Sequence, residues 1–231
     1  MQIFSIFFLI NKKLLKSFWS FNQMIKVTFN YFFISPYKCH INPKLYYGGA
    51  LKGDLGGPSV KIKKLNYFFP EHKWNFNITY LLSNSKYLNL RSLNLIKKKG
   101  TPILLNQNGV FYPGWFDGDW EKENLKMSKI YHFADYVLWQ SNFCKKASDK
   151  FLGKRNGKGE ILYNAVDTSV FIPENKSNDK NFIFLITGNI RIKSNYRISS
   201  VLFALKEVIK ENNNTLLIIA GFVEDRKYFH S

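Results

Sequence analysis

Short apolar runs alternate with stretches of helical periodicity along most of this chain, and this alternation leaves few folds open. The apolar runs predict strands, and the stretches between them predict helices. The expected strands are residues 25–30, 76–82, 102–106, 136–139 and 160–163. The expected helices are residues 58–66, 87–98, 121–133 and 142–152, the last of them capped by Ser141 and ended by Gly153. Strands that alternate with helices in this way predict an α/β fold with a parallel sheet.

Residues 174–181 are all polar or charged, and we expect them to form a linker between two domains. Beyond the linker the alternation resumes, with a strand at 182–187, a helix at 196–211 and a strand at 215–220. Residues 24–173 are long enough for a complete Rossmann-like, doubly wound domain. Only about 50 residues follow the linker, whereas such a domain usually needs about 100 or more. Residues 182–231 are therefore expected to be the start of a second, incomplete Rossmann-like domain.

The first 23 residues allow two interpretations. Their apolar run at 3–10 is shorter than the ~20 residues of a membrane span, and it lacks the features of a secretory signal. Lysines at 12, 13 and 16 alternate with apolar residues, which favours a helix on a membrane surface. Alternatively, Met24 directly precedes the first expected strand, and residues 1–23 are an extension produced by a misplaced start codon.

The chain carries a formal net charge of +18, which suggests a polyanionic partner. Its richness in Lys, Asn, Ile, Phe and Tyr offers a second explanation, because an AT-rich genome raises the lysine content without selection for binding. The two cysteines, Cys39 and Cys144, cannot form a disulfide framework and fit a reducing, cytoplasmic compartment. Cys39 and His40 are adjacent, but no further Cys or His stands at ligand spacing, and we expect no metal site.

A glycine pair, Gly56 and Gly57, lies between the first expected strand and the first expected helix. Glycines let the backbone approach a ligand closely, and Pro58 suits the first position of the helix. The free N–H groups of such a helix start can bind an anion. The alternative is a flexible glycine-rich loop without a ligand. The spacing does not match the G-x-G-x-x-G fingerprint of dinucleotide-binding proteins.

Amides and aromatic residues follow the strand at 102–106. Asn108 lies in the amide stretch, and residues 111–116 form an aromatic loop. Amides can bind sugar hydroxyls and rings can pack on sugar C–H faces, which indicates a sugar site. The acidic cluster at 117–123 could serve a hydrolase that uses paired carboxylates. We favour a helix start for this cluster, because acidic residues commonly compensate the helix dipole there.

Residues 161–173 closely resemble the N-G-V-D-x-x-x-F-x-P signature of group 1 (family 4) glycosyltransferases, with Ala165 in place of the usual glycine. Residues 134–141 resemble the A-D-x-V/I-x-x-x-S element of the same family, and residues 55–65 resemble its glycine-pair loop and first helix. Residues 188–193 resemble the phosphate-binding G-R-x-x-x-x-K stretch. Asn189 replaces its arginine, so the basic pair Arg191 and Lys193 is slightly out of register.

The resemblance implies a GT-B glycosyltransferase that transfers a sugar from a nucleotide-diphosphate sugar to a glycan or lipid-linked acceptor. The reaction would retain the anomeric configuration and would require no metal or other cofactor. Gly188, Arg191 and Lys193 would bind the donor phosphates, and Gly56 and Gly57 would belong to the acceptor-side cleft. Asn108 takes the place of a histidine that many members carry there. The catalytic residues stay unidentified.

The family's E-x7-E element, which holds the donor sugar and ribose, is missing from the sequence. We therefore expect the chain to be an inactive or partial glycosyltransferase. A lipid-linked acceptor would place it in the cytoplasm, with the option of peripheral contact at the inner face of the membrane.

Two other functions compete with glycosyl transfer. The charge allows a nucleic-acid-binding protein, but the basic residues are scattered and no binding motif is recognised, so no nucleic-acid partner is expected. A GT-B nucleotide-sugar epimerase would share the fold and differ in the reaction.

Overall fold

The computed structural model describes residues 2–35, 42–54, 56–83, 88–114, 116–173, 181–188, 190–192 and 195–224. It divides into two compact units. The first comprises Met1–Phe111 and Asp119–Asn164, and the second comprises Tyr112–Gly118 and Ala165–Ser231.

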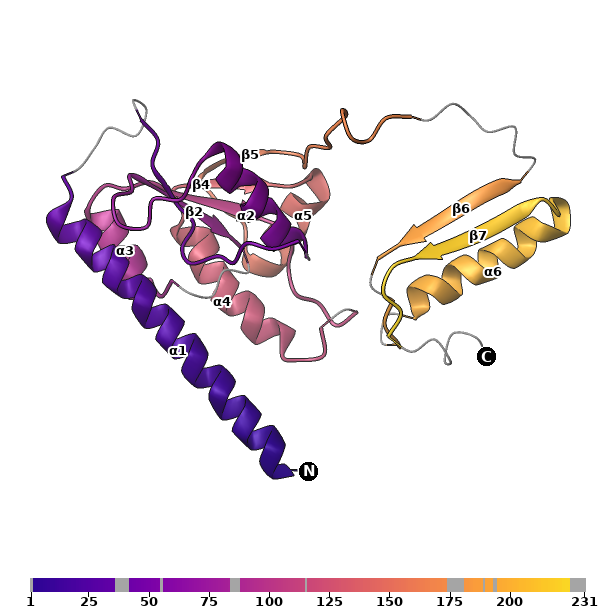
Figure 1. Cartoon of the computed structure of the whole chain (residues 1–231), viewed down its shortest axis with the longest axis horizontal. Coiled ribbons are helices and arrows are strands. Elements are labelled where there is room, and N and C mark those ends of the chain that lie inside the picture. The colour runs from indigo at the N-terminus through magenta and orange to yellow at the C-terminus, as the bar shows by residue number, and fades with distance from the viewer. Residues whose placement is uncertain are drawn as a thin grey trace. The chain divides into compact units, whose positions relative to one another are not determined.

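The first unit is built on a five-stranded sheet in which all neighbouring strands are parallel and follow the order β1-β2-β3-β4-β5 (Figure 1). Its strands are β1 (Leu45–Tyr46), β2 (Ile78–Leu82), β3 (Ile103–Gln107), β4 (Tyr136–Trp139) and β5 (Lys158–Ile161). Its helices are α1 (Gln2–Phe33), α2 (Gly57–Phe68), α3 (Leu90–Lys98), α4 (Trp120–Phe133) and α5 (Asn142–Leu152). The expected α/β class with a parallel sheet is confirmed. The strand order is consecutive, without the reversal that marks the switch point of a doubly wound sheet.

Helices cover both faces of this sheet. Successive strand residues point to opposite faces, so Tyr80, Leu82 and Leu138 lie on one face, where they form a core with Ile62 of α2. On the other face Tyr46 donates a hydrogen bond from its hydroxyl to Gln23 of α1 (2.6 Å). The same face holds α4, where the Gln107 amide lies 3.3 Å from the Met127 sulfur, and α3 packs against α1.

Side chains cap the amino ends of α4 and α5, as the sequence predicts. Ser141 accepts a hydrogen bond from the Cys144 N–H (3.0 Å) at the start of α5, and Gly153 follows the helix with φ 92°. Asp119 caps α4 in the same way, because its carboxylate accepts a hydrogen bond from the Lys122 N–H (2.8 Å). This contact confirms the helix-start role for this part of the acidic cluster. Asp135 accepts from the Ile103 N–H (2.9 Å) and thereby ties the start of β4 to that of β3.

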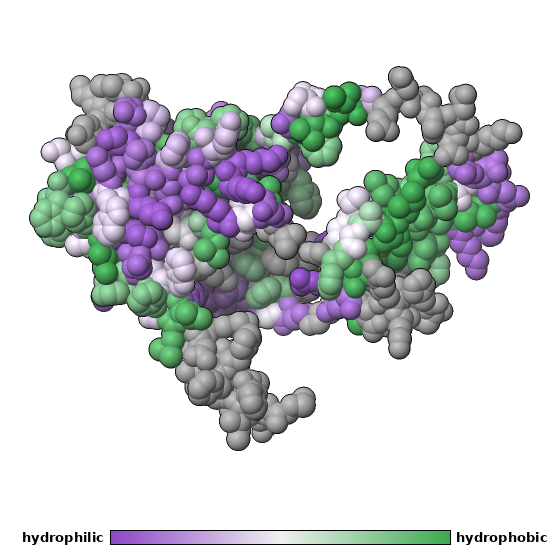
Figure 2. All heavy atoms as spheres, in the orientation of Figure 1, coloured by the Kyte–Doolittle hydropathy of each residue, from purple (hydrophilic) through white to green (hydrophobic). Residues whose placement is uncertain are grey.

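The described residues of the second unit contain a β-α-β unit made of β6 (Phe182–Thr187), α6 (Tyr196–Glu211) and β7 (Thr215–Ala220). The two strands are parallel and paired along their whole length. All three elements have the bounds predicted from sequence. Their apolar residues remain largely exposed, with Phe182 at 60% and Leu185 at 61%, and Figure 2 shows an expanse of hydrophobic residues over β6 and β7.

The N-terminal region differs from expectation. Residues 25–30, predicted as a strand because they form a short apolar run, belong to α1, which runs without a break across the expected boundary at Met24. The β-branched residues Ile25, Val27 and Thr28 favour a strand locally, but Val27 is buried as part of the helix face that packs on the sheet. The first strand is instead β1, which the sequence reading missed. The expected linker lies outside the described residues, except for Asn181.

Among the described residues, no helix combines the length and the apolar character that crossing a membrane requires.

Candidate functional site

The carboxyl ends of the parallel strands of the first unit meet at one edge of its sheet. Ligands of open α/β sheets commonly bind at this edge, because loops and helix starts follow the strands there. The described residues that directly follow β1, β2, β3 and β4 are Tyr47, Ser83, Asn108 and Gln140. This edge is therefore the candidate site.

The start of α2 is open at this edge. Gly56 is the residue before the helix, with φ 82°, and no side chain forms a capping hydrogen bond there. A methyl group added to Gly56 or Gly57 would meet no atom within 4 Å, and the first turn holds no acidic residue. An uncapped helix start carries unsatisfied N–H groups and partial positive charge, which suit an anion.

Lys61 brings this helix start to the middle of the sheet. Its ammonium group donates a hydrogen bond to Asn106 Oδ1 at the end of β3 (3.0 Å), although α2 follows β1 in the chain. The side chain is half-buried, and burial lowers the pKa of Lys61, an effect that nearby Cys144 partly opposes. The glycine pair therefore lies at the start of a helix whose second turn contacts the end of β3.

Asn108 joins the ends of three neighbouring strands. Its N–H donates to Ser83 Oγ beyond β2 (3.1 Å), and its Oδ1 accepts a hydrogen bond from Gln140 Nε2 beyond β4. The side chain is half-buried. The edge therefore presents a fixed group of amides and a hydroxyl, and Lys61 contacts the same edge at Asn106, as a ligand rich in hydroxyls and negative charge requires.

Cys144 lies beneath this group at the start of α5. Its Sγ donates to the Gln107 carbonyl (3.1 Å), and burial raises the pKa of the thiol. A neutral thiol is a poor nucleophile, so the geometry gives Cys144 a packing role. Within the described residues, no three His, Cys, Asp or Glu side chains gather as a metal site would require. Cys39 and His40 lie outside those residues.

In the second unit, the segments after β6 and β7 continue side by side. Gly188 (φ 141°) and Gly221 (φ 145°) lie so close that a Cβ on Gly221 would approach the Gly188 oxygen to 2.0 Å. The Ile190 N–H then donates to the Phe222 carbonyl (2.8 Å). Arg191 is exposed just beyond this pairing, while Lys193 lies outside the described residues. Gly188 thus directly follows β6, as the sequence predicts, and its role in binding phosphate stays a prediction.

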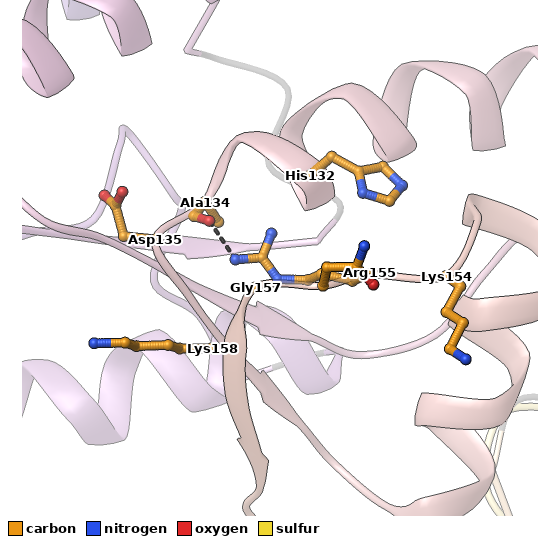
Figure 3. Close-up of a pocket in the computed structure, with 8 residues that line it drawn as sticks. His132, Ala134, Asp135, Lys154, Arg155, Gly157 and Lys158 are labelled. Atoms are coloured by element: carbon orange, nitrogen blue, oxygen red, sulfur yellow. Dashed lines mark hydrogen bonds between the residues drawn. The ribbon is translucent and has the colours of Figure 1, made fainter.

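A separate hollow of about 650 Å³ lies at the opposite, amino edge of the first sheet (Figure 3). Lys154, Arg155 and Lys158 line it together with Asp135. Arg155 donates to the carbonyls of Tyr131 (2.6 Å) and Ala134, which end α4. This arginine therefore caps the carboxyl end of α4, and we assign the basic residues of the hollow a structural role.

Comparisons with known proteins include one distant structural likeness. No family model matches the chain, and no curated protein matches it. This chain is similar to a solved structure described as Anabaena Alr3699/HepE in complex with UDP. The alignment covers 70% of this chain and 51% of the HepE chain. The sequence identity is 11% and the TM-score is 0.38. The chain thus spans about half the length of that protein.

Sequence reasoning missed Lys61, Ser83 and Gln140. Lys61 offered a signal, because it stands four residues before Leu65 and so shares the helix face that packs on the sheet. Ser83 and Gln140 each follow a strand end, and the order of the strands was needed to show that they flank Asn108.

Proposed function

We propose that the chain is the acceptor-side domain and the beginning of the donor domain of a GT-B glycosyltransferase. Its reaction is the transfer of a sugar from a nucleotide-diphosphate sugar to a glycan or lipid-linked acceptor. On the resemblance of its motifs to family 4, the transfer retains the anomeric configuration and requires no metal or other cofactor.

The observation that carries this proposal is the convergence at the carboxyl edge of the first sheet. The uncapped start of α2 at Gly56 and Gly57, the half-buried ammonium of Lys61, and the amides around Asn108 lie at this edge. Positive charge and N–H groups suit phosphate, and fixed amides suit sugar hydroxyls. A nucleotide sugar or a phosphorylated acceptor contains both kinds of group.

In the second unit, the proposal assigns Gly188, Arg191 and Lys193 to the donor diphosphate. Departure of a nucleoside diphosphate builds negative charge on the leaving group, and nearby cations stabilise that charge. The uncapped start of α6, which has no acidic residue in its first turn, supports this assignment because it adds donors at the same end of the strands.

Chemical-shift mapping of backbone amides tests both assignments. We expect UDP or GDP to shift the amides of Gly188 and Arg191, and a sugar phosphate, as a probe for the acceptor, to shift those of Gly56, Gly57 and Asn108. Lys61→Met should weaken sugar-phosphate binding by about tenfold, the scale of one hydrogen bond to a charged group. Lys64→Met, on an exposed position of the same helix, is the matched control.

Shifts confined to the hollow around Lys154, or equal effects of the two lysine variants, would contradict the proposed site. Heteropolymer DNA serves as the second arm. Binding to DNA with a steep dependence on salt, and no response to nucleotides, would instead support the nucleic-acid-binding alternative.

A further inference from the structure

Helix α1 has one face that packs on the first unit. Val27 is 1% exposed, and Gln23 and Asn30 are equally buried. The Asn30 amide donates to the carbonyls of Trp74 (2.9 Å) and Phe76 (3.1 Å). These contacts fix which side of the helix faces outward.

The outward side of α1 is apolar. Leu14, Phe18, Phe21, Ile25 and Phe32 are between 44% and 68% exposed. At 100° per residue these five side chains fall within an arc of about 60° on the helix, opposite the packed face. We call these five residues the outer stripe. An exposed helix of a globular protein normally shows polar residues on this side, so the stripe indicates a site of interaction.

The charge of α1 and of the whole chain indicates which class of partner the outer stripe binds. The 32 residues of α1 include no Asp or Glu, and the whole chain carries a formal net charge of +18. A second copy of this helix offers no acidic group to its partner, and two chains of charge +18 repel each other. A membrane surface rich in anionic lipid offers both an apolar layer for the stripe and negative charge for this basic chain.

We propose that α1 lies in the plane of an anionic membrane surface, with the outer stripe inserted among the lipid chains. The segment from Leu14 to Phe32 is about 27 Å long at the rise of an α-helix, and it would lie flat. The aromatic side chains of Phe18, Phe21 and Phe32 bury large apolar areas at such an interface. This inference does not depend on the proposed glycosyl transfer.

Vesicle flotation tests the proposal with the full chain. We expect binding to vesicles of phosphatidylcholine with 30% phosphatidylglycerol, weaker binding to phosphatidylcholine alone, and release by high salt. Phe18→Ser combined with Phe21→Ser should reduce binding by about tenfold or more, because each replacement removes a large apolar group from the lipid. Phe143→Ser combined with Leu125→Ser is the matched control, since these residues are exposed on α5 and α4 (81% and 62%).

Three results would overturn the proposal. Equal losses in the test and control variants would show that binding does not involve the stripe. A dimer of the wild-type chain that the stripe variant dissociates, without vesicle binding, would assign the stripe to a second copy. Loss of helical circular dichroism in the stripe variant would show that the stripe packs within the protein.

Discussion

The strands β3 and β6 begin with equally apolar sequences, but their side chains differ in how deeply they are buried. In the first unit, Ile103 and Leu105 of β3 are completely buried, between neighbouring strands and beneath helices on both faces. In the second unit, Phe182 and Leu185 of β6 are more than half exposed, because the described residues of that unit supply β6 with one neighbouring strand and one helix. An apolar run thus predicts a strand, while its burial depends on how many elements surround it.

This contrast also bears on stability. Burial of apolar area supplies most of the favourable free energy of folding, at about 25 cal/mol per Å². The first unit obtains this contribution on both faces of its sheet, whereas a lone β-α-β unit obtains little of it. We therefore expect the two units to differ in local stability.

The largest effect is expected from the matched pair Leu105→Ala and Leu185→Ala. Removing a completely buried leucine costs about 2–5 kcal/mol of unfolding free energy, whereas the exposed Leu185 should cost less than about 1 kcal/mol. Denaturant unfolding followed by circular dichroism measures the first, and hydrogen exchange of the β6 amides measures the second. An equal cost in both variants would show that β6 is covered in solution.

A second pair, Gly221→Ala and Gly188→Ala, separates backbone strain from a steric clash within the second unit. Both glycines have positive φ, but only the Cβ at 221 would collide with backbone, at the Gly188 oxygen. Both variants should lose about 1–3 kcal/mol from strain, and Gly221→Ala should lose more. The readout is hydrogen exchange at β6 and β7. Identical effects would mean that the loops after the two strands do not approach each other as described.

The smallest effect is expected from Tyr47→Phe in the first unit. Burial raises the pKa of Tyr47 to about 12, with help from the charge of Glu71. The folded state therefore keeps the phenolic proton above pH 10, where the unfolded state releases it, and stability falls as pH rises from 10 to 12.

Replacement by Phe should make that fall shallower, and at pH 7 it should cost about 1 kcal/mol through loss of the hydrogen bond to the Phe69 carbonyl (2.8 Å). Denaturant unfolding at a series of pH values checks this, with the exposed Tyr67→Phe as control. An unchanged slope in Tyr47→Phe would show that another group dominates the alkaline loss of stability.

The sequence predicted most elements because periodicity and local caps determine them. The helix 142–152, with Ser141 and Gly153 at its ends, and the three elements of the second unit have the predicted bounds. The strand expected at 25–30 was wrong, because packing of Val27 outweighs the strand preference of its neighbours. Gly56, Gly57 and Asn108 could be selected from sequence, but the Lys61–Asn106 contact spans 45 positions and depends on the fold.

The hydrogen bond from the Ile103 N–H to Asp135 has a consequence for how sequence likeness is interpreted. Asp135 and Ser141 are two of the residues that carry the resemblance at 134–141, and both have structural roles. Asp135 joins two strands, and Ser141 caps a helix. A descendant that had lost all catalysis would still need both residues to fold. Likeness at these positions therefore bears on the fold, and evidence for chemistry has to come from side chains that the fold does not require.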